Sequence, residues 1–194
     1  EELKLALTMA YLKWDFRNGS MCRKARGIMK SATESLSEKQ NGVSDKINEY
    51  EDKLTSKQLQ QLGKALQKID PHQINQSLDG ASSSLIAKEK VENNFSILKG
   101  LKSFDFLQNI NFPVVIPDQG RTRWLERMGF IEQVLDSKSK RLQSVKIQEE
   151  FAHQIGVSLQ EFSTVTGAFA GSLGEDYKSS AFCLRTPKCP ECPL

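Results

Sequence analysis

The sequence has few of the residues, and none of the short motifs, that mark an enzyme. It contains two histidines, His72 and His153, and neither shows a catalytic carboxylate or thiol partner. It has no H-E-x-x-H zinc motif, no phosphate-binding P-loop, no G-x-S-x-G nucleophile motif and no glycine-rich dinucleotide turn. Because no residue is poised for proton transfer or nucleophilic attack, we expect a non-enzymatic protein without a cofactor.

Long apolar runs and a strong charge imbalance are also missing. No apolar stretch approaches the roughly 18 residues that a membrane-spanning helix requires. The net charge of +3 is too small to indicate a nucleic-acid partner by itself. The chain is 38% hydrophobic over 194 residues, which suffices for one core and excludes collagen-like and wholly disordered chains.

Apolar residues recur at spacings of three and four along most of the chain, and strand patterns are nearly absent. The segment 3–16 is apolar almost all round and should form a helix in the middle of a bundle. Thr55 and Ser158 each begin a capping box, S/T-x-x-E/Q, at the start of a helix. Further helices are expected at 21–36, 47–69, 84–101, 122–135 and 147–155. We predict an all-α fold, an elongated helical bundle with shorter helices at one end.

One segment departs from this pattern. Residues 104–118, FDFLQNINFPVVIPD, end in β-branched residues bounded by two prolines, which predicts an extended link rather than a central strand. We expect a helical domain over 1–172, composed of a long-helix bundle (about 1–101), this linker and a helical subregion (119–172). An irregular cysteine-rich tail (173–194) follows. Apolar side chains of the linker are candidates for binding a protein partner: Phe104, Phe106, Phe112, Val114 and Ile116.

Four cysteines are present, Cys22, Cys183, Cys189 and Cys192, and three of them lie in the last twelve residues. Two disulfides are the favoured interpretation and would imply an oxidising compartment. The alternative is a zinc site built on the C-x-x-C spacing of Cys189 and Cys192, completed by the other two thiolates. A redox pair would need a helix N-terminus to activate a thiol, and unpaired tail thiols are the remaining alternative.

Three N-x-S sequons occur, at Asn18, Asn75 and Asn94. Asn18 and Asn75 lie in expected turns and are the glycosylation candidates, whereas Asn94 lies in an expected helix. Chance occurrence of the short motif is the alternative explanation.

The segment 147–167, IQEEFAHQIGVSLQEFSTVTG, has the spacing of a helix-turn-helix pair. Ala152 allows close helix approach, Gly156 takes the turn, and Phe162 and Val165 are expected to point inward. A DNA-reading second helix needs basic or amide side chains facing the groove, and residues 158–170 contain Gln160 but no lysine or arginine. We therefore favour a structural corner over a nucleic-acid interface.

Basic residues gather in two places. Arg23, Lys24, Arg26 and Lys30 share a stretch without acidic residues, which is typical of a solvated helix face and is the candidate basic face. Three arginines surround Trp124 at the start of a helix, where Trp124 is expected to pack inward with Met128 and Ile131: Arg121, Arg123 and Arg127.

The first residue is Glu rather than Met, which suggests a removed leader or a trimmed chain. Together with the clustered cysteines and the sequons, it favours an exported protein, whether secreted, periplasmic or surface-exposed. We expect a non-enzymatic module that binds a protein partner through helical and extended apolar surface. The alternative is an intracellular regulatory protein associated with nucleic acid, in which 147–167 forms a helix-turn-helix-like pair and the cysteines bind zinc.

Overall fold

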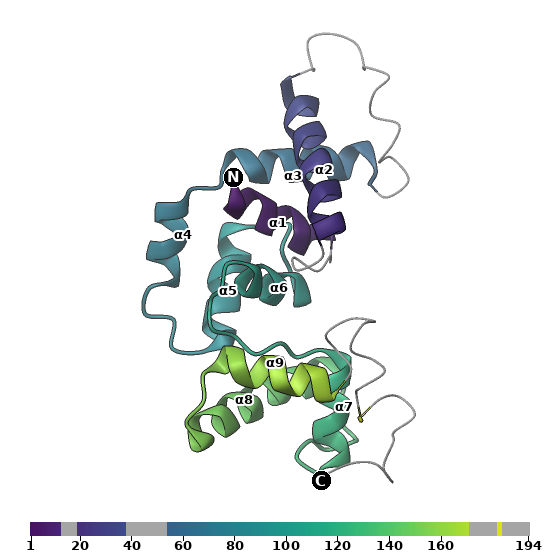
Figure 1. Cartoon of the computed structure of the whole chain (residues 1–194), viewed down its shortest axis with the longest axis vertical. Coiled ribbons are helices and arrows are strands. Elements are labelled where there is room, and N and C mark those ends of the chain that lie inside the picture. The colour runs from purple at the N-terminus through teal and green to yellow at the C-terminus, as the bar shows by residue number, and fades with distance from the viewer. Residues whose placement is uncertain (13–18, 38–53, 171–181, 184–194) are drawn as a thin grey trace. The chain divides into compact units, whose positions relative to one another are not determined.

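The computed structural model describes residues 1–12, 19–37, 54–170 and 182–183 (Figure 1). All regular secondary structure in these ranges is helical, which confirms the predicted all-α class. The helices of these ranges are α1 (Glu2–Leu12), α2 (Gly19–Ser37), α3 (Ser56–Gln67), α4 (Pro71–Leu78), α5 (Ser84–Asn94), α6 (Leu101–Asn109), α7 (Gln119–Arg127), α8 (Ser137–Ile155) and α9 (Leu159–Phe169).

The chain divides into two compact units. The first unit comprises residues 1–80 and 88–111, and the second comprises 81–87 and 112–194. Helix α5 begins in the second unit and continues into the first. The boundary predicted at residue 172 lies outside the described residues and stays a prediction.

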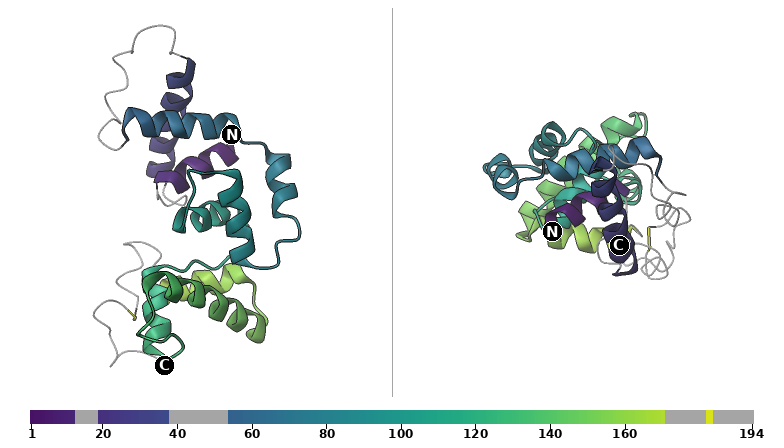
Figure 2. Two further views of the ribbon diagram at one scale, coloured as in Figure 1. Left: turned by 180° about the vertical axis from the view of Figure 1, so that it is seen from behind. Right: turned by 90° about the horizontal axis from the view of Figure 1, so that it is seen from above.

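Helix α1 is the centre of the first unit. It packs against α2, α3 and α6, as the front and rear views both show (Figures 1 and 2). Seven consecutive residues from Leu5 to Tyr11 are buried, as expected of a helix that is apolar on almost every side. On one face, Leu5 and Met9 pack with Ala25 of α2.

The first turns of α3 and α4 are each capped by a side chain that directly precedes the helix. Thr55 forms the predicted capping box: its hydroxyl accepts from the Gln58 amide at 3.3 Å, and the Gln58 side chain accepts from the Thr55 amide at 2.8 Å. Asp70 caps α4, with Pro71 at the first helical position. Helix α4 lies outside the helices expected from the sequence, because a proline disfavours helix at the residue before it but also suits the first turn of a new helix.

The two helices around residue 100 correct the sequence prediction. The helix predicted over 84–101 ends at Asn94, and residues 104–109 of the predicted extended link belong to α6, which begins at Leu101. Residues 95–100 connect the two helices, and Gly100 directly before α6 has a φ of +66°, which a continuous right-handed helix could not contain. The extended stretch is therefore confined to 112–118.

Glycine residues with positive φ also end two helices of the second unit. The helix predicted over 122–135 ends as α7 at Arg127, where Gly129 (φ +78°) begins a turn closed by the Phe130 amide and the Leu125 carbonyl at 2.9 Å. Gly156 (φ +71°) ends α8 in the same manner, and Ser158 forms the predicted capping box of α9 with Glu161.

A buried arginine joins α7 to α9. The Arg121 side chain is 2% exposed. Its guanidinium forms an ion pair with Asp118, donates to the Ser163 carbonyl, and donates from Nε to the Thr166 hydroxyl at 3.3 Å. Burial lowers the pKa of Arg121, and the neighbouring Asp118 carboxylate opposes that shift.

Arg121 also explains why one inward-facing prediction was wrong. Val165 was expected to point inward, yet it is 67% exposed. Ser163 and Thr166 face inward instead, because their oxygens accept hydrogen bonds from Arg121. A buried guanidinium requires such acceptors, so α9 turns its polar side toward α7.

Replacing Asp118 by serine should destabilise the second unit by about 3 kcal/mol, because the buried guanidinium loses its countercharge. Serine keeps an oxygen that can cap α7, so the loss reports on charge rather than on capping. The double variant D118S/R121M should recover most of the loss, since it removes the buried charge as well. Urea denaturation measures both, and equal instability of the two variants would refute this role for Arg121.

Candidate functional site

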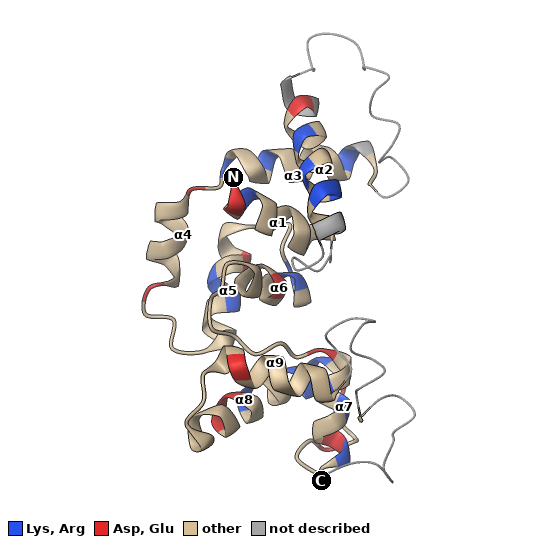
Figure 3. Cartoon of the chain, in the orientation of Figure 1, with Lys and Arg blue, Asp and Glu red and all other residues tan. Residues whose placement is uncertain are grey.

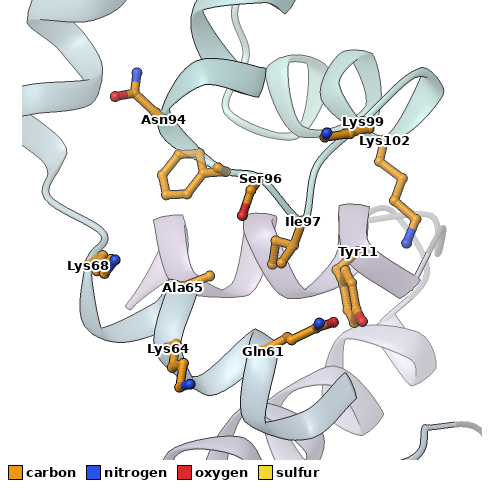
Figure 4. A pocket seen from close by; sticks show the side chains of 11 residues that line it. Tyr11, Gln61, Lys64, Ala65, Lys68, Asn94, Ser96, Ile97, Lys99 and Lys102 are labelled. Atoms are coloured by element: carbon orange, nitrogen blue, oxygen red, sulfur yellow. The ribbon is translucent and has the colours of Figure 1, made fainter. Parts of the chain in front are cut away.

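The first unit contains a pocket of about 520 Å³ between α1, α3 and the connection from α5 to α6 (Figure 4). Its lining contains four lysines and no carboxylate. The lining residues are Tyr11, Gln61, Lys64, Ala65, Lys68, Asn94, Phe95, Ser96, Ile97, Lys99 and Lys102.

Lysines stand on two sides of this pocket. Lys64 lies on α3, and Lys68 is the C-cap residue that follows this helix with right-handed helical φ and ψ. The two lysines are four residues apart and therefore lie on one side of the helix end. Lys99 and Lys102 come from the end of the α5–α6 connection and the first turn of α6. Lys64, Lys68 and Lys99 are exposed, and none of these three forms an ion pair with another described residue.

Tyr11 of α1 lines the pocket. The Lys102 ammonium lies over its ring, 4.2 Å from the centroid, which is a cation–π contact. Burial raises the pKa of the Tyr11 hydroxyl, so this group stays protonated and available as a hydrogen-bond donor. Figure 4 shows the Lys102 side chain reaching toward the Tyr11 ring.

Glu92 of α5 fixes the wall that carries Lys99 and Lys102. One carboxylate oxygen accepts from the Gly100 amide at 2.7 Å and from the Ser103 hydroxyl at 3.1 Å. The other accepts from Lys88 at 2.7 Å. Burial raises the pKa of this carboxyl, but the hydrogen bonds outweigh it, and the net pKa lies below the ordinary value. The ionised carboxylate therefore stabilises the start of α6.

The residues predicted as a partner-binding surface are mostly core residues. Phe104, Phe106, Val114 and Ile116 are buried, and Phe112 is half-buried. Phe106 packs edge-on against Phe95, with ring centroids 5.6 Å apart. The prediction of an accessible surface here was wrong because Phe104 and Phe106 lie on a short helix, α6, which turns these side chains into the core of its unit.

The predicted basic face lies on the exposed side of α2. Arg23, Lys24, Arg26 and Lys30 are all exposed, as the blue turns of α2 in Figure 3 illustrate, while Ala25 and Ile28 are buried on the inner side. Lys30 lies 3.8 Å from Glu34 one turn later. This is the solvated helix face that the sequence pattern favoured.

No disulfide joins the cysteines in the described ranges. Cys183 is buried, and its sulfur accepts from Arg127 at 3.3 Å. Cys22 is half-buried on α2. The favoured prediction of a disulfide is therefore not met at these two positions, while Cys189 and Cys192 lie outside the described residues.

One of the two described sequons differs from expectation, and the other agrees with it. Asn75 is exposed but lies within α4 rather than in a turn, because Asp70 and Pro71 begin a helix there. Asn94 ends α5, and its amide donates to the Ser77 hydroxyl at 3.1 Å. Asn18 lies outside the described residues.

The predicted helix pair at 147–167 is present as α8 and α9. Gly156 makes the turn, and Ala152 and Phe162 are buried as expected. Glu161 is the one charged side chain of α9, so this helix offers no cation to a phosphate backbone.

Exposed apolar side chains gather in the second unit. Phe130 is 45% exposed and packs edge-on against Phe151 of α8, with centroids 5.0 Å apart. Ile155 follows Phe151 by one helical turn and is 64% exposed. We call Phe130, Phe151 and Ile155 the Phe130 surface.

Comparisons with known proteins leave the geometry as the sole basis for assigning a function. No protein-family model, curated protein or solved structure matches this chain. None of the described helices has the length and apolarity needed to cross a membrane. Within the same ranges, His, Cys, Asp and Glu side chains form no group of three that could hold a metal ion.

The Glu92 carboxylate predicts a pH dependence of stability. Its folded-state pKa lies below the ordinary 4.5, so its stabilisation is present above that pH and is lost as the pH falls through the folded-state pKa. E92Q should cost about 1–2 kcal/mol of unfolding free energy at neutral pH, and the difference from the unmutated chain should shrink in acid.

Urea denaturation at pH 7 and at acidic pH tests this expectation. E89Q is the matched control, because Glu89 is exposed on the same helix and no hydrogen bond to its side chain is formed in the described part of the chain. A loss for E89Q as large as that for E92Q, or a loss for E92Q that does not diminish in acid, would contradict the role assigned to Glu92.

Proposed function

We propose that this protein is a non-enzymatic module that binds a protein partner through the Phe130 surface. One observation supports the proposal: every large apolar side chain that is exposed in the described ranges belongs to the second unit. These are Ile86, Met128, Phe130, Val134, Leu142, Ile155, Val157 and Val165. Contiguous exposed apolar side chains are typical of protein-interaction sites.

The Phe130 surface is suited to bind an apolar ridge of another protein. Phe130 and Phe151 are aromatic side chains whose mutual contact restricts their rotamers, which lowers the entropy cost of binding. Ile155 extends the surface by one helical turn along α8. Burial of such side chains contributes about 1.5–3 kcal/mol each when it is complete.

Ile155→Asp should weaken binding of the partner at least about tenfold, because a charge would be buried against apolar groups. A photo-reactive residue at position 155 first identifies the partner by crosslinking, and titration of the purified partner then gives the dissociation constant.

H153D is the matched control, since His153 is exposed on the same helical turn and the substitution also introduces one carboxylate. It should change the dissociation constant by less than about twofold. Equal loss in I155D and H153D, or crosslinking at 153 as strong as at 155, would reject the Phe130 surface. Crosslinking to a second copy of this chain would identify the partner as itself.

We also propose that the protein is exported, with Cys189 and Cys192 joined in a disulfide. Both cysteines lie outside the described residues, and the proposal keeps the part of the disulfide prediction that falls on them. The mass of the unreduced protein from its native source should be lower by two hydrogen atoms than that of the reduced protein. Alkylation in denaturant without reductant should label two cysteines; labelling of all four would refute the oxidising compartment.

A further inference from the structure

We infer that the pocket of the first unit binds a small ligand that carries two or more phosphate groups. All its lining residues belong to the first unit, so the inference is independent of the Phe130 surface. The inference rests on four lysines from two separate chain segments. They surround one cavity whose lining contains no carboxylate.

The charges of this pocket are not balanced by its own lining. Lys64 of α3 and its C-cap residue Lys68 lie on one side, and Lys99 and Lys102 lie on the other, as Figure 4 shows. Like charges that converge on a cavity raise its positive potential and attract anions. An anion with a single charged group would reach one side, whereas one with several such groups can contact both.

The cations of the lining suit phosphate groups. Lysine is a compact point charge and a common binder of phosphate, and its three N–H donors can reach several phosphate oxygens. The lining contains four lysines and no arginine. Gln61, Ser96 and the protonated hydroxyl of Tyr11 add neutral groups that can donate to phosphate oxygens.

The size and floor of the pocket favour a small molecule. Its volume of about 520 Å³ lies within the range of about 300–1,000 Å³ that small-molecule sites occupy. Ala65 and Phe95 are buried and Ile97 is half-buried, so apolar atoms lie beneath the ring of polar groups. A ligand with a carbon skeleton bearing phosphates would contact both zones.

One wall of the pocket is held in place by contacts within the protein. Glu92 lies outside the lining and binds the Gly100 amide and the Ser103 hydroxyl, on either side of Leu101 and Lys102. The Lys102 ammonium rests on the Tyr11 ring. Binding therefore needs little reorganisation of this wall, which favours affinity.

Tripolyphosphate is the probe, titrated calorimetrically into the full chain at low and at physiological salt. We expect one site per chain, with affinity that falls as salt rises. K64Q/K68Q should weaken binding at least about tenfold. K24Q/K57Q is the control of equal net charge, because Lys24 and Lys57 are exposed in the same unit but do not line the pocket.

A second variant leaves every lysine in place. S96E introduces a carboxylate at an exposed lining position and should abolish binding. Acetylation of surface lysines, read by mass spectrometry, should decrease at Lys64, Lys68 and Lys99 when tripolyphosphate is added and stay unchanged at Lys57.

Three results would overturn the inference: no binding near about 1 mM tripolyphosphate, equal loss in K64Q/K68Q and K24Q/K57Q, or equal protection of Lys57. Vesicles that contain a bisphosphorylated phosphoinositide, compared with neutral vesicles, identify the source of the phosphates. Binding to these vesicles that is lost in both K64Q/K68Q and S96E supports a lipid headgroup as the ligand. Tripolyphosphate binding without vesicle binding supports a free metabolite.

Discussion

The buried guanidinium of Arg121 is the constraint on which the second unit depends. A charge that is 2% exposed must have acceptors around it, and α7 and α9 provide them through Asp118, Ser163 and Thr166. The rotation of α9 about its own axis follows from this need. Val165 is thereby turned outward, and the apolar exposure of this unit is partly a consequence of how the buried Arg121 is satisfied.

In the first unit, a carboxylate joins neighbouring elements through its hydrogen bonds, as Arg121 does in the second. Glu92 is bound by one ammonium, one amide and one hydroxyl, and these donors belong to α5, the connection and α6. Both arrangements fix a helix start through a charged side chain rather than through apolar packing alone. They differ in what they expose: lysines around a pocket in the first unit, and apolar side chains in the second.

The sequence predicted features that depend on a few adjacent residues. The capping boxes at Thr55 and Ser158 and the turn at Gly156 are correct, because each is decided by side chains and backbone within one helical turn. The break at Gly100 was missed, since an isolated glycine inside an apolar pattern does not reveal that a carboxylate eight residues away accepts from its amide.

Features that depend on tertiary contacts were predicted poorly. The sequence predicts Phe104 and Phe106 as accessible because it does not reveal the helix on which they lie. It predicts Val165 as inward-facing because apolar spacing cannot reveal a buried arginine on another helix. The pocket combines residues from Tyr11 to Lys102, which no local motif connects. Its four lysines come from two segments that are far apart in the sequence, and they line one cavity only because α1, α3 and the α5–α6 connection pack together.

The reactivity of the Cys183 thiol can report local opening within the second unit. Its sulfur rests against Arg127, its carbonyl accepts from Arg123, and its amide donates to the Phe169 carbonyl. Phe182 stacks on Phe169 beside it. A thiol buried by these contacts reacts with a reagent only when the contacts open transiently. The rate at which Cys183 reacts therefore reports how often the covering contacts open, without any added label.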